Sequence, residues 1–180
     1  MLKAMAAPYG AMRFMPTGGI DGSNILSYLQ FDKILCCGGS FMVKDDLIKA
    51  GDWATITELT RGAVRSMLGF EFAHIGINTE SKEEAERAAK LFDMMFGMPV
   101  RETSKSYFAG NSFELMMKKG PGKFGHIGIK TNFVDRAIAY FERLGFEFDA
   151  DSITYADNGK PKFAYFKEEI AGFAVHIVAK

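Results

Sequence analysis

The sequence has little of what marks secreted, membrane-spanning or nucleic-acid-binding proteins. Its 180 residues include only two cysteines, the neighbours Cys36 and Cys37. Because adjacent cysteines cannot join distant segments, a secreted disulfide framework is excluded, and a reducing cytoplasm is the expected location. No apolar run reaches the roughly 18 residues that a membrane-spanning helix needs. The 22 basic and 22 acidic residues cancel, so the composition predicts neither a nucleic-acid nor a membrane partner.

What is present divides into two unlike parts, residues 1–69 and 70–180. The first part contains two strand-then-helix units, in which the extended runs 13–16 and 33–37 each lead into a pair of glycines. Apolar strands that alternate with helices are typical of a parallel sheet covered by helices. We expect helices near residues 24–29, from about residue 44, and from residue 52 to about residue 67. The last helix has an apolar residue at every third or fourth position, which predicts one buried face: Trp53, Ile56, Leu59, Ala63 and Met67.

The second part contains an internal repeat. Residues 71–77 match residues 123–129, so that residue 74 corresponds to residue 126 at an offset of 52 positions. An amphipathic helix is expected after each copy, at about 81–96 and 133–144, and several strands follow each helix. A duplicated strand–helix–strands unit of the α+β class therefore accounts for this part. The two copies span residues of about 70–120 and 121–180.

Polar residues occupy related positions in the two copies. The sequence has three histidines: His74 and His126 fall in the opening strands, and His176 falls in the closing strand of the second copy, where the first copy has Glu114. Side chains alternate along a strand, so their apolar neighbours can pack under the helices while these four residues share the opposite face. Three imidazoles and one carboxylate suit a divalent ion such as Zn, Fe, Mn, Co or Ni. The alternative is that they are polar residues on the solvated face of half-buried strands.

Residues 70–180 resemble the vicinal oxygen chelate superfamily, which includes glyoxalase I and the extradiol dioxygenases. The resemblance implies paired βαβββ modules around a metal-holding cleft, with His74, Glu114, His126 and His176 as the metal ligands. The closing ligand in that family is commonly glutamate, whereas here it is His176. In glyoxalase-like members a metal-bound glutamate also moves protons as a base, and only Glu114 could take that catalytic role here.

Residues 1–69 resemble a different family, through Pro-Thr-Gly-Gly-Ile at 16–20, Cys-Gly-Gly-Ser-Phe at 37–41 and Ala-Gly-Asp-Trp at 50–53. They are similar to the end of 2-keto-3-deoxy-6-phosphogluconate / 2-keto-4-hydroxyglutarate aldolase, a TIM barrel whose last two strand–helix units they would form. Loops at that end of such barrels often bind phosphate, and glycine lets the backbone approach an anion closely. The alternative is that the glycine pairs only make tight turns. The resemblance implies phosphate or substrate contacts from six residues: Thr17, Gly18, Gly19, Gly38, Gly39 and Ser40.

The reaction implied by this resemblance is retro-aldol cleavage of a phosphorylated 2-keto sugar acid, or another 2-keto acid, to pyruvate through a lysine Schiff base. In that family the lysine and a proton-moving glutamate lie on earlier barrel strands, which would precede Met1. We therefore expect the chain alone to lack aldolase activity. It would be the C-terminal portion of a longer aldolase, begin at an internal methionine, or assemble with another chain that supplies the rest of the barrel.

Three functions stay open. The first is a pyruvate-forming aldolase whose fused domain binds a metal or a metabolite. The second is a non-catalytic module that regulates or stabilises the aldolase. The third is an independent metal-dependent isomerase or lyase that uses Glu114 as its base. No nucleotide cofactor is expected, and the uncovered strand edges of residues 1–69 predict a homo-oligomer.

Overall fold

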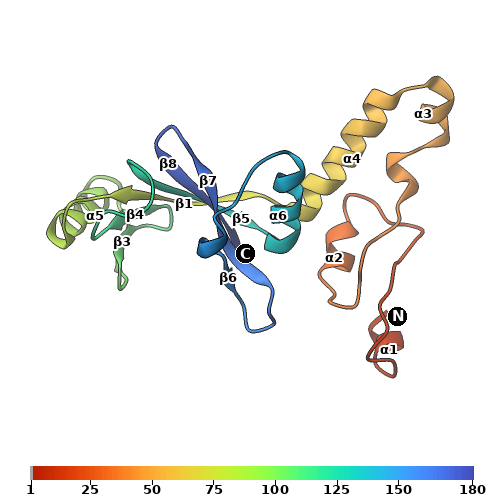
Figure 1. The fold of residues 1–180 in the computed structure, drawn as a ribbon, viewed down its shortest axis with the longest axis horizontal. Coiled ribbons are helices and arrows are strands. Elements are labelled where there is room, and N and C mark those ends of the chain that lie inside the picture. Colours follow the sequence, from red (N-terminus) through yellow and green to blue (C-terminus); the bar gives the residue numbers. More distant parts are fainter. Residues whose placement is uncertain (1) are drawn as a thin grey trace. The chain divides into compact units, whose positions relative to one another are not determined.

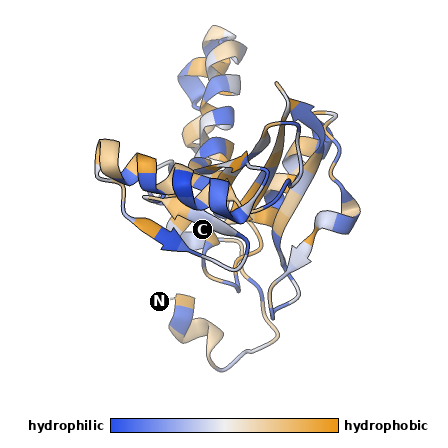
Figure 2. Ribbon diagram, turned by 90° about the vertical axis from the view of Figure 1, so that its left-hand side faces the viewer, coloured by the Kyte–Doolittle hydropathy of each residue, from blue (hydrophilic) through white to orange (hydrophobic). Residues whose placement is uncertain are grey.

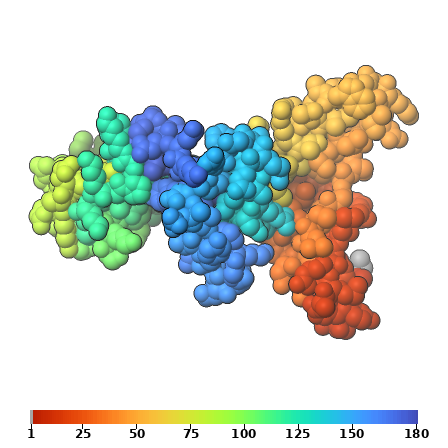
Figure 3. Space-filling view, in the orientation of Figure 1, coloured from red at the N-terminus to blue at the C-terminus, as the bar shows by residue number. Residues whose placement is uncertain are grey.

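The computed structural model describes residues 2–180. Internal contacts divide the chain into two compact units, unit 1 at residues 1–69 and unit 2 at residues 70–180. Figure 3 draws unit 1 in red to orange-yellow and unit 2 from there through green to blue. Within residues 2–180, no helix combines the length and the apolar character that crossing a bilayer requires.

Unit 1 contains four short helices and one long one. They are α1 (Leu2–Ala6), α2 (Ile25–Leu29), the 3-10 helix η1 (Ser40–Met42), α3 (Asp45–Ala50) and α4 (Trp53–Leu68). The helices expected near residue 24, after residue 44 and from residue 52 are confirmed. α4 begins where the Asp52 side chain accepts a hydrogen bond from the Thr55 backbone N–H, and it ends at Gly69, whose left-handed φ of 55° suits glycine.

The two extended runs of unit 1 lie side by side in parallel, but they pair less than the sequence predicts. They form a single bridge, between Phe14 and Ile34. The Phe14 N–H donates to the Lys33 carbonyl at 2.8 Å, and the Leu35 N–H donates to the Phe14 carbonyl at 3.0 Å. Two strands alone cannot cover a sheet face, and as a result Met15 and Leu35 remain 59% and 65% exposed.

The apolar face of α4 is covered only in part. Ala63 is buried and Leu59 is half-buried, whereas Trp53 is 61% exposed. The prediction of a buried face was therefore wrong at Trp53, which stays exposed although α2, α3 and η1 all contact α4. Hydrophobic and hydrophilic stretches alternate along the helices in Figure 2.

Unit 2 is one eight-stranded sheet made of two βαβββ modules. The first module runs through β1 (Glu71–Asn78), α5 (Lys82–Phe96), β2 (Val100–Glu102), β3 (Ser106–Ala109) and β4 (Phe113–Met116). The second runs through β5 (Gly125–Thr131), α6 (Val134–Arg143), the 3-10 helix η2 (Ala150–Ser152), β6 (Thr154–Tyr155), β7 (Pro161–Ile170) and β8 (Phe173–Ala179). The strand order is β2-β3-β4-β1-β5-β8-β7-β6 (Figure 1). The expected α+β fold with paired βαβββ modules is confirmed.

The two opening strands join the modules. β1 pairs with β4 in parallel, and β5 pairs with β8 in parallel, while β1 and β5 pair with each other in antiparallel fashion. Because the opening strands are neighbours, residues that the repeat relates come together at the centre of the sheet. This arrangement positions the candidate site.

The two modules are packed differently under their helices. In the first module Ala85 and Ala89 of α5 are fully buried, and Phe92 stacks on Phe113 with ring centroids 4.6 Å apart. The second module instead has a cavity of about 510 Å³ beside α6. Four phenylalanines and four β-branched residues form most of its apolar lining: Phe70, Phe141, Phe146, Phe166, Ile129, Ile170, Val175 and Ile177. This cavity lies on the sheet face away from the histidines, since these strand residues alternate with Gly128 and His176.

Candidate functional site

Four strands at the centre of unit 2 carry the four polar residues, and strand register places them on one face. In β1, Gly76 lies opposite both Glu114 of β4 and His126 of β5. In β5, Gly128 lies opposite both His74 of β1 and His176 of β8. The structure therefore brings together all four residues that the repeat singled out.

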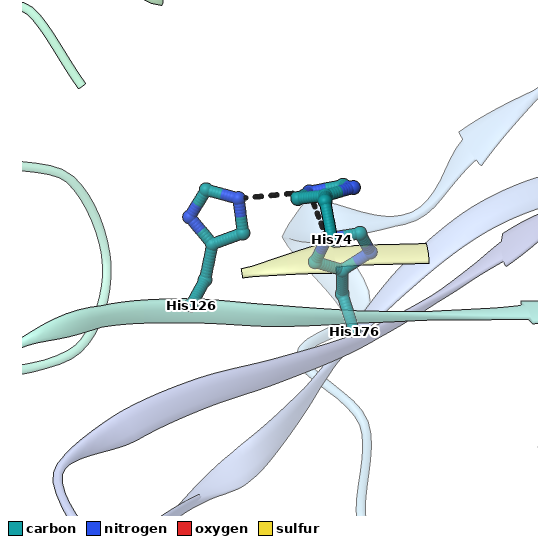
Figure 4. A group of neighbouring side chains, drawn as sticks. All are labelled: His74, His126 and His176. Carbon is teal, nitrogen blue, oxygen red and sulfur yellow. Dashed lines mark hydrogen bonds between the residues drawn. The ribbon is translucent and has the colours of Figure 1, made fainter. Parts of the chain in front are cut away.

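The donor atoms of the four residues converge. The Nε2 atom of His74 lies 3.1 Å from Nε2 of His126, 3.4 Å from Nε2 of His176 and 3.3 Å from Oε2 of Glu114. The distance from Nε2 of His126 to Oε2 of Glu114 is 3.2 Å. Figure 4 shows His74 linked to both His126 and His176. Ligand atoms from the three histidines all lie within 4.8 Å of one another.

These distances fit a divalent ion. Neighbouring nitrogen and oxygen ligands that lie about 2.0–2.1 Å from a zinc-sized ion stand roughly 2.8–3.4 Å apart in octahedral and tetrahedral arrangements. Without a cation, Nε2 of His74 carries at most one hydrogen and can donate to only one of the three donor atoms that lie beside it. A cation bound between the four donor atoms would accept a lone pair from each of them at once.

The outer side of the cluster is held by ring packing. The Nδ1 atoms of His126 and His176 are buried, and neither has a hydrogen-bond partner among residues 2–180. Metal-binding histidines usually donate this second N–H to an acceptor, and that support is missing here. Instead, Phe163 packs on His176 with ring centroids 4.5 Å apart, and Phe108 packs edge-on against His74 at 5.9 Å.

Two glycines that the sequence reasoning passed over make room for the imidazoles. A Cβ atom on Gly76 would lie 2.0 Å from Cε1 of His126, and one on Gly128 would lie 2.8 Å from Cε1 of His74 and 2.9 Å from Cε1 of His176. The signal was in the repeat, because each opening strand reads His-Ile-Gly-Ile. In antiparallel pairing, the glycine of each copy faces the histidine of the other copy.

A buried hydroxyl orients the carboxylate. Ser106 of β3 is fully buried, and its hydroxyl donates to Oε1 of Glu114 at 2.6 Å. The Ser106 hydroxyl also lies 2.8 Å from that of Thr103. This contact occupies Oε1, so that Oε2 is the oxygen turned toward the histidines. Nothing in the sequence spacing indicates Ser106, since it meets Glu114 across the β3–β4 pair.

Burial sets the charge states of the cluster. It lowers the pKa of His176 to about 3, together with the neighbouring His126 and His74. Burial also lowers the pKa of His74, against the opposing effect of Glu114. Burial by itself would raise the pKa of Glu114, but hydrogen bonds with His126 and Ser106 outweigh it and bring that pKa below its usual value. At neutral pH, His74 and His176 are neutral and Glu114 is ionised, which are the forms that bind metals.

The two glycine turns of unit 1 also lie together. The Gly38 N–H donates to the Pro16 carbonyl at 3.0 Å, and a Cβ atom on Gly38 would lie 2.9 Å from Cγ2 of Thr17. Gly18 and Gly19 have φ values of 78° and 64°, which glycine adopts without strain. The turn at 17–19 is exposed and Gly38 and Gly39 are half-exposed, so backbone groups there are open to a ligand.

Residues 1–59 match the family model of KDPG and KHG aldolase. These 59 residues are called the aldolase segment. The chain is 44% identical over 68 residues to the 2-dehydro-3-deoxy-phosphogluconate aldolase of Pseudoalteromonas atlantica, a match that covers 38% of this chain and 32% of that protein. It is 48% identical over 63 residues to the KHG/KDPG aldolase of Escherichia coli, covering 35% of this chain and 30% of that protein. The chain thus spans about a third of the length of these curated relatives.

Solved structures match unit 2 at low identity. A methylmalonyl-CoA epimerase of Streptomyces coelicolor is similar with a TM-score of 0.46 and 15% identity, over 61% of this chain and 96% of that chain. A hypothetical protein from Bacillus halodurans gives a TM-score of 0.46 and 14% identity, over 62% of this chain and 94% of that chain. The methylmalonyl-CoA epimerase from Mycobacterium tuberculosis gives 0.44 and 13%, over 60% and 86%.

The candidate residues therefore form two separate sets. The glycine turns, with Thr17 and Ser40, belong to the aldolase segment, and the histidines with Glu114 belong to unit 2. Each set is assembled within its own unit.

Proposed function

We propose that unit 2 binds one divalent metal ion through His74, Glu114, His126 and His176. One observation carries this proposal: donor atoms from four strands converge on one sheet face, where Nε2 of His74 lies 3.1–3.4 Å from a donor atom of each of the other three residues. Three nitrogen donors and one oxygen donor favour Zn, Fe, Co, Ni or Mn over Mg and Ca. When bound, such an ion would act as a Lewis acid on an oxygen atom of a small molecule.

Within this set, Glu114 is the residue suited to move a proton. It is the one carboxylate among the four, and Ser106 fixes its orientation through Oε1. A base must lie within hydrogen-bond reach of the proton that it takes, and Oε2 faces the position of the proposed ion. An isomerase or lyase would need this carboxylate as a base, whereas a binding or regulatory module would need it only as a ligand.

Metal loading tests the site directly. We expect the chelator-treated protein to bind one equivalent of Zn, Ni or Mn and to melt at a higher temperature with the ion, because a ligand at 100 times its Kd stabilises by about 2.7 kcal/mol. The variants His126→Ala and Glu114→Gln should lose most of this shift. Glu102→Gln is the matched control, since Glu102 is an exposed carboxylate of the same module, paired with Lys82. A wild-type protein that shows neither stoichiometric metal nor a shift would end the proposal.

We further propose that the aldolase segment forms the last two strand–helix units of an aldolase barrel for phosphorylated 2-keto sugar acids or other 2-keto acids. The match over residues 1–59 and the contact between the two glycine turns support this proposal. Thr17, Gly18, Gly19, Gly38, Gly39 and Ser40 would contact the phosphate.

The Schiff-base lysine would come from another part of such a barrel. Borohydride trapping of this 180-residue chain with pyruvate should therefore give no adduct. A lysine labelled in this experiment would overturn that part of the proposal. In a complete aldolase, unchanged kinetics after His126→Ala, together with lost metal binding, would assign unit 2 a binding or regulatory role. Self-association and a cytoplasmic location remain predictions.

A further inference from the structure

The cavity beside α6 is a second candidate site in unit 2. It measures about 510 Å³, and residues of β5, β7, β8, α6 and the segment 145–147 line it. Val175 and Ile177 form a buried floor, whereas Phe146 and Ile170 are 45% and 62% exposed, so the cavity opens to solvent beside them. Protein interiors contain few voids larger than a water molecule. An apolar opening of this size is therefore a candidate for ligand binding.

Two differences between the modules create this cavity. α6 has 10 residues where α5 has 15, so α6 is about 7.5 Å shorter and covers less of its sheet. On β7, Tyr165 lies opposite His176 and Glu169 lies opposite Ala174, which leaves two extra residues on β7. Residues 166–168 form this bulge, and all three line the cavity. The β3–β4 pair of the first module has no such shift. Bulges often re-aim side chains beside functional sites.

Phenylalanine rings that support one another form one wall of the cavity. The ring centroid of Phe141 lies 5.3 Å from that of Phe70, 5.9 Å from that of Phe146 and 5.0 Å from that of Phe166. Phe166 also packs on the buried Phe148 at 4.3 Å. Because each ring is held by its neighbours, the wall does not need a ligand to keep its shape. Such a surface suits an apolar molecule, since cavities lined in this way are poor sites for water.

The charged groups of the lining disfavour an anionic ligand. They are the carboxylates of Glu147 and Glu168 and the ammonium group of Lys167. Nζ of Lys167 lies 2.6 Å from Oε2 of Glu147, so its positive charge is already matched, and Glu168 leaves the lining with a net negative charge. The volume is about three times that of a cavity of roughly 150 Å³ that binds benzene. A molecule with two or three rings, or an alkyl chain of similar bulk, would therefore fit.

We propose that this cavity binds one uncharged, largely apolar small molecule. The site is separate from the histidine cluster, because Val175 and Ile177 flank His176 in β8 and their side chains lie on the other face of the sheet. The inference does not depend on the proposed metal site, and its test is made with a chelator present.

The test uses the 180-residue chain and the uncharged probe N-phenyl-1-naphthylamine, whose fluorescence increases in apolar surroundings. We expect saturable binding of one equivalent. Phe146→Ala removes one ring of the wall and should raise the Kd of the probe roughly tenfold or more. Phe96→Ala, at a 60% exposed phenylalanine of α5, is the matched control and should leave this Kd unchanged. 1-Decanol should displace the probe at a concentration roughly tenfold lower than decanoate does, because a charged group is costly to bury here.

A second measurement locates the probe without any variant. In methyl-labelled protein, nuclear Overhauser effects should connect the probe to the methyl groups of Ile129, Val175 and Ile177. Effects to other methyl groups alone would overturn the site, as would the absence of saturable binding or equal affinity of Phe146→Ala and wild type. Decanoate that displaces the probe as well as 1-decanol would overturn the ligand class. Binding that weakens as the protein concentration increases would assign the cavity to an interface between two copies of the chain and overturn the proposal.

Discussion

Unit 1 and unit 2 differ in how much of their surroundings they provide for themselves. Unit 1 contains the aldolase segment, and the chain is 48% identical to the Escherichia coli enzyme over 63 residues. The two extended runs of unit 1 nevertheless share one bridge and leave Met15 and Leu35 exposed. Unit 2 lies outside the matched residues 1–59. It nevertheless forms an eight-stranded sheet and gathers four polar side chains at its centre.

A close sequence match to a known enzyme therefore does not mean that a segment covers its own apolar residues. Within unit 1, apolar residues of the aldolase segment such as Met15 and Leu35 stay exposed despite the match over residues 1–59. Duplication has the opposite effect in unit 2, because each module provides the partner strand that the other needs.

The largest expected effect comes from separating the units. A polypeptide of residues 70–180 should unfold in one cooperative transition and keep its response to Zn, because its sheet and site are internal. A polypeptide of residues 1–69 should show no cooperative transition, or should associate, since one parallel bridge cannot hold a sheet. Circular-dichroism melts and sedimentation would measure both. A monomeric 1–69 polypeptide with a sharp melting transition would break the contrast.

The next effect tests the space that the repeat leaves for imidazoles. Gly76→Ala places a methyl group where Cε1 of His126 would lie 2.0 Å away, so the ring must move and metal affinity should fall roughly 10- to 100-fold. Gly62→Ala in α4 is the control, because nothing lies within 4 Å of its added Cβ. It should leave metal binding unchanged and add roughly 0.5–1 kcal/mol to the free energy of unfolding. Calorimetric Zn titration would measure the metal affinity of both variants. Normal binding by Gly76→Ala would refute the role of this glycine.

Unit 2 shows which parts of the site can be predicted from sequence. Strand alternation and the repeat predict that His74, Glu114, His126 and His176 share a face, and the structure places them together. The roles of Gly76 and Ser106 depend on which residues stand opposite them in neighbouring strands. Register of that kind is set by the assembled sheet, so spacing along the chain does not reveal it.

Unit 1 shows the same limit for packing. The N-cap at Asp52 is a local signal, and together with the apolar period it predicts α4 to within one or two residues. The 3.6-residue period identifies an apolar face, but it does not say what covers that face. Trp53 therefore belongs to the predicted face and yet remains exposed.

A moderate effect is expected from acid on the metal-free protein. The pKa of His176 is 6.5 as a reference value and about 3 in the folded chain, chiefly because of burial. As the pH falls below about 6.5, His176 binds a proton in the unfolded state but stays neutral in the folded state, so the free energy of unfolding decreases. The loss from this residue should be on the order of 2 kcal/mol at pH 5 relative to pH 7.5. Urea denaturation with chelator present measures it, and His176→Gln should flatten the slope. Stability that rises on acidification would contradict this assignment.

The smallest expected effect is also the most direct comparison of the two units. Leu35 is 65% exposed in unit 1, and Leu115 is 1% exposed in unit 2. Leu35→Ala should change the free energy of unfolding by less than about 0.5 kcal/mol, whereas Leu115→Ala should cost roughly 2–5 kcal/mol because it leaves a cavity against α5. Urea denaturation of both variants in the 180-residue chain measures the pair. If Leu35→Ala cost about 2 kcal/mol, and the loss depended on protein concentration, another copy of the chain would cover this leucine in solution. The exposed strands of unit 1 would then form an interface.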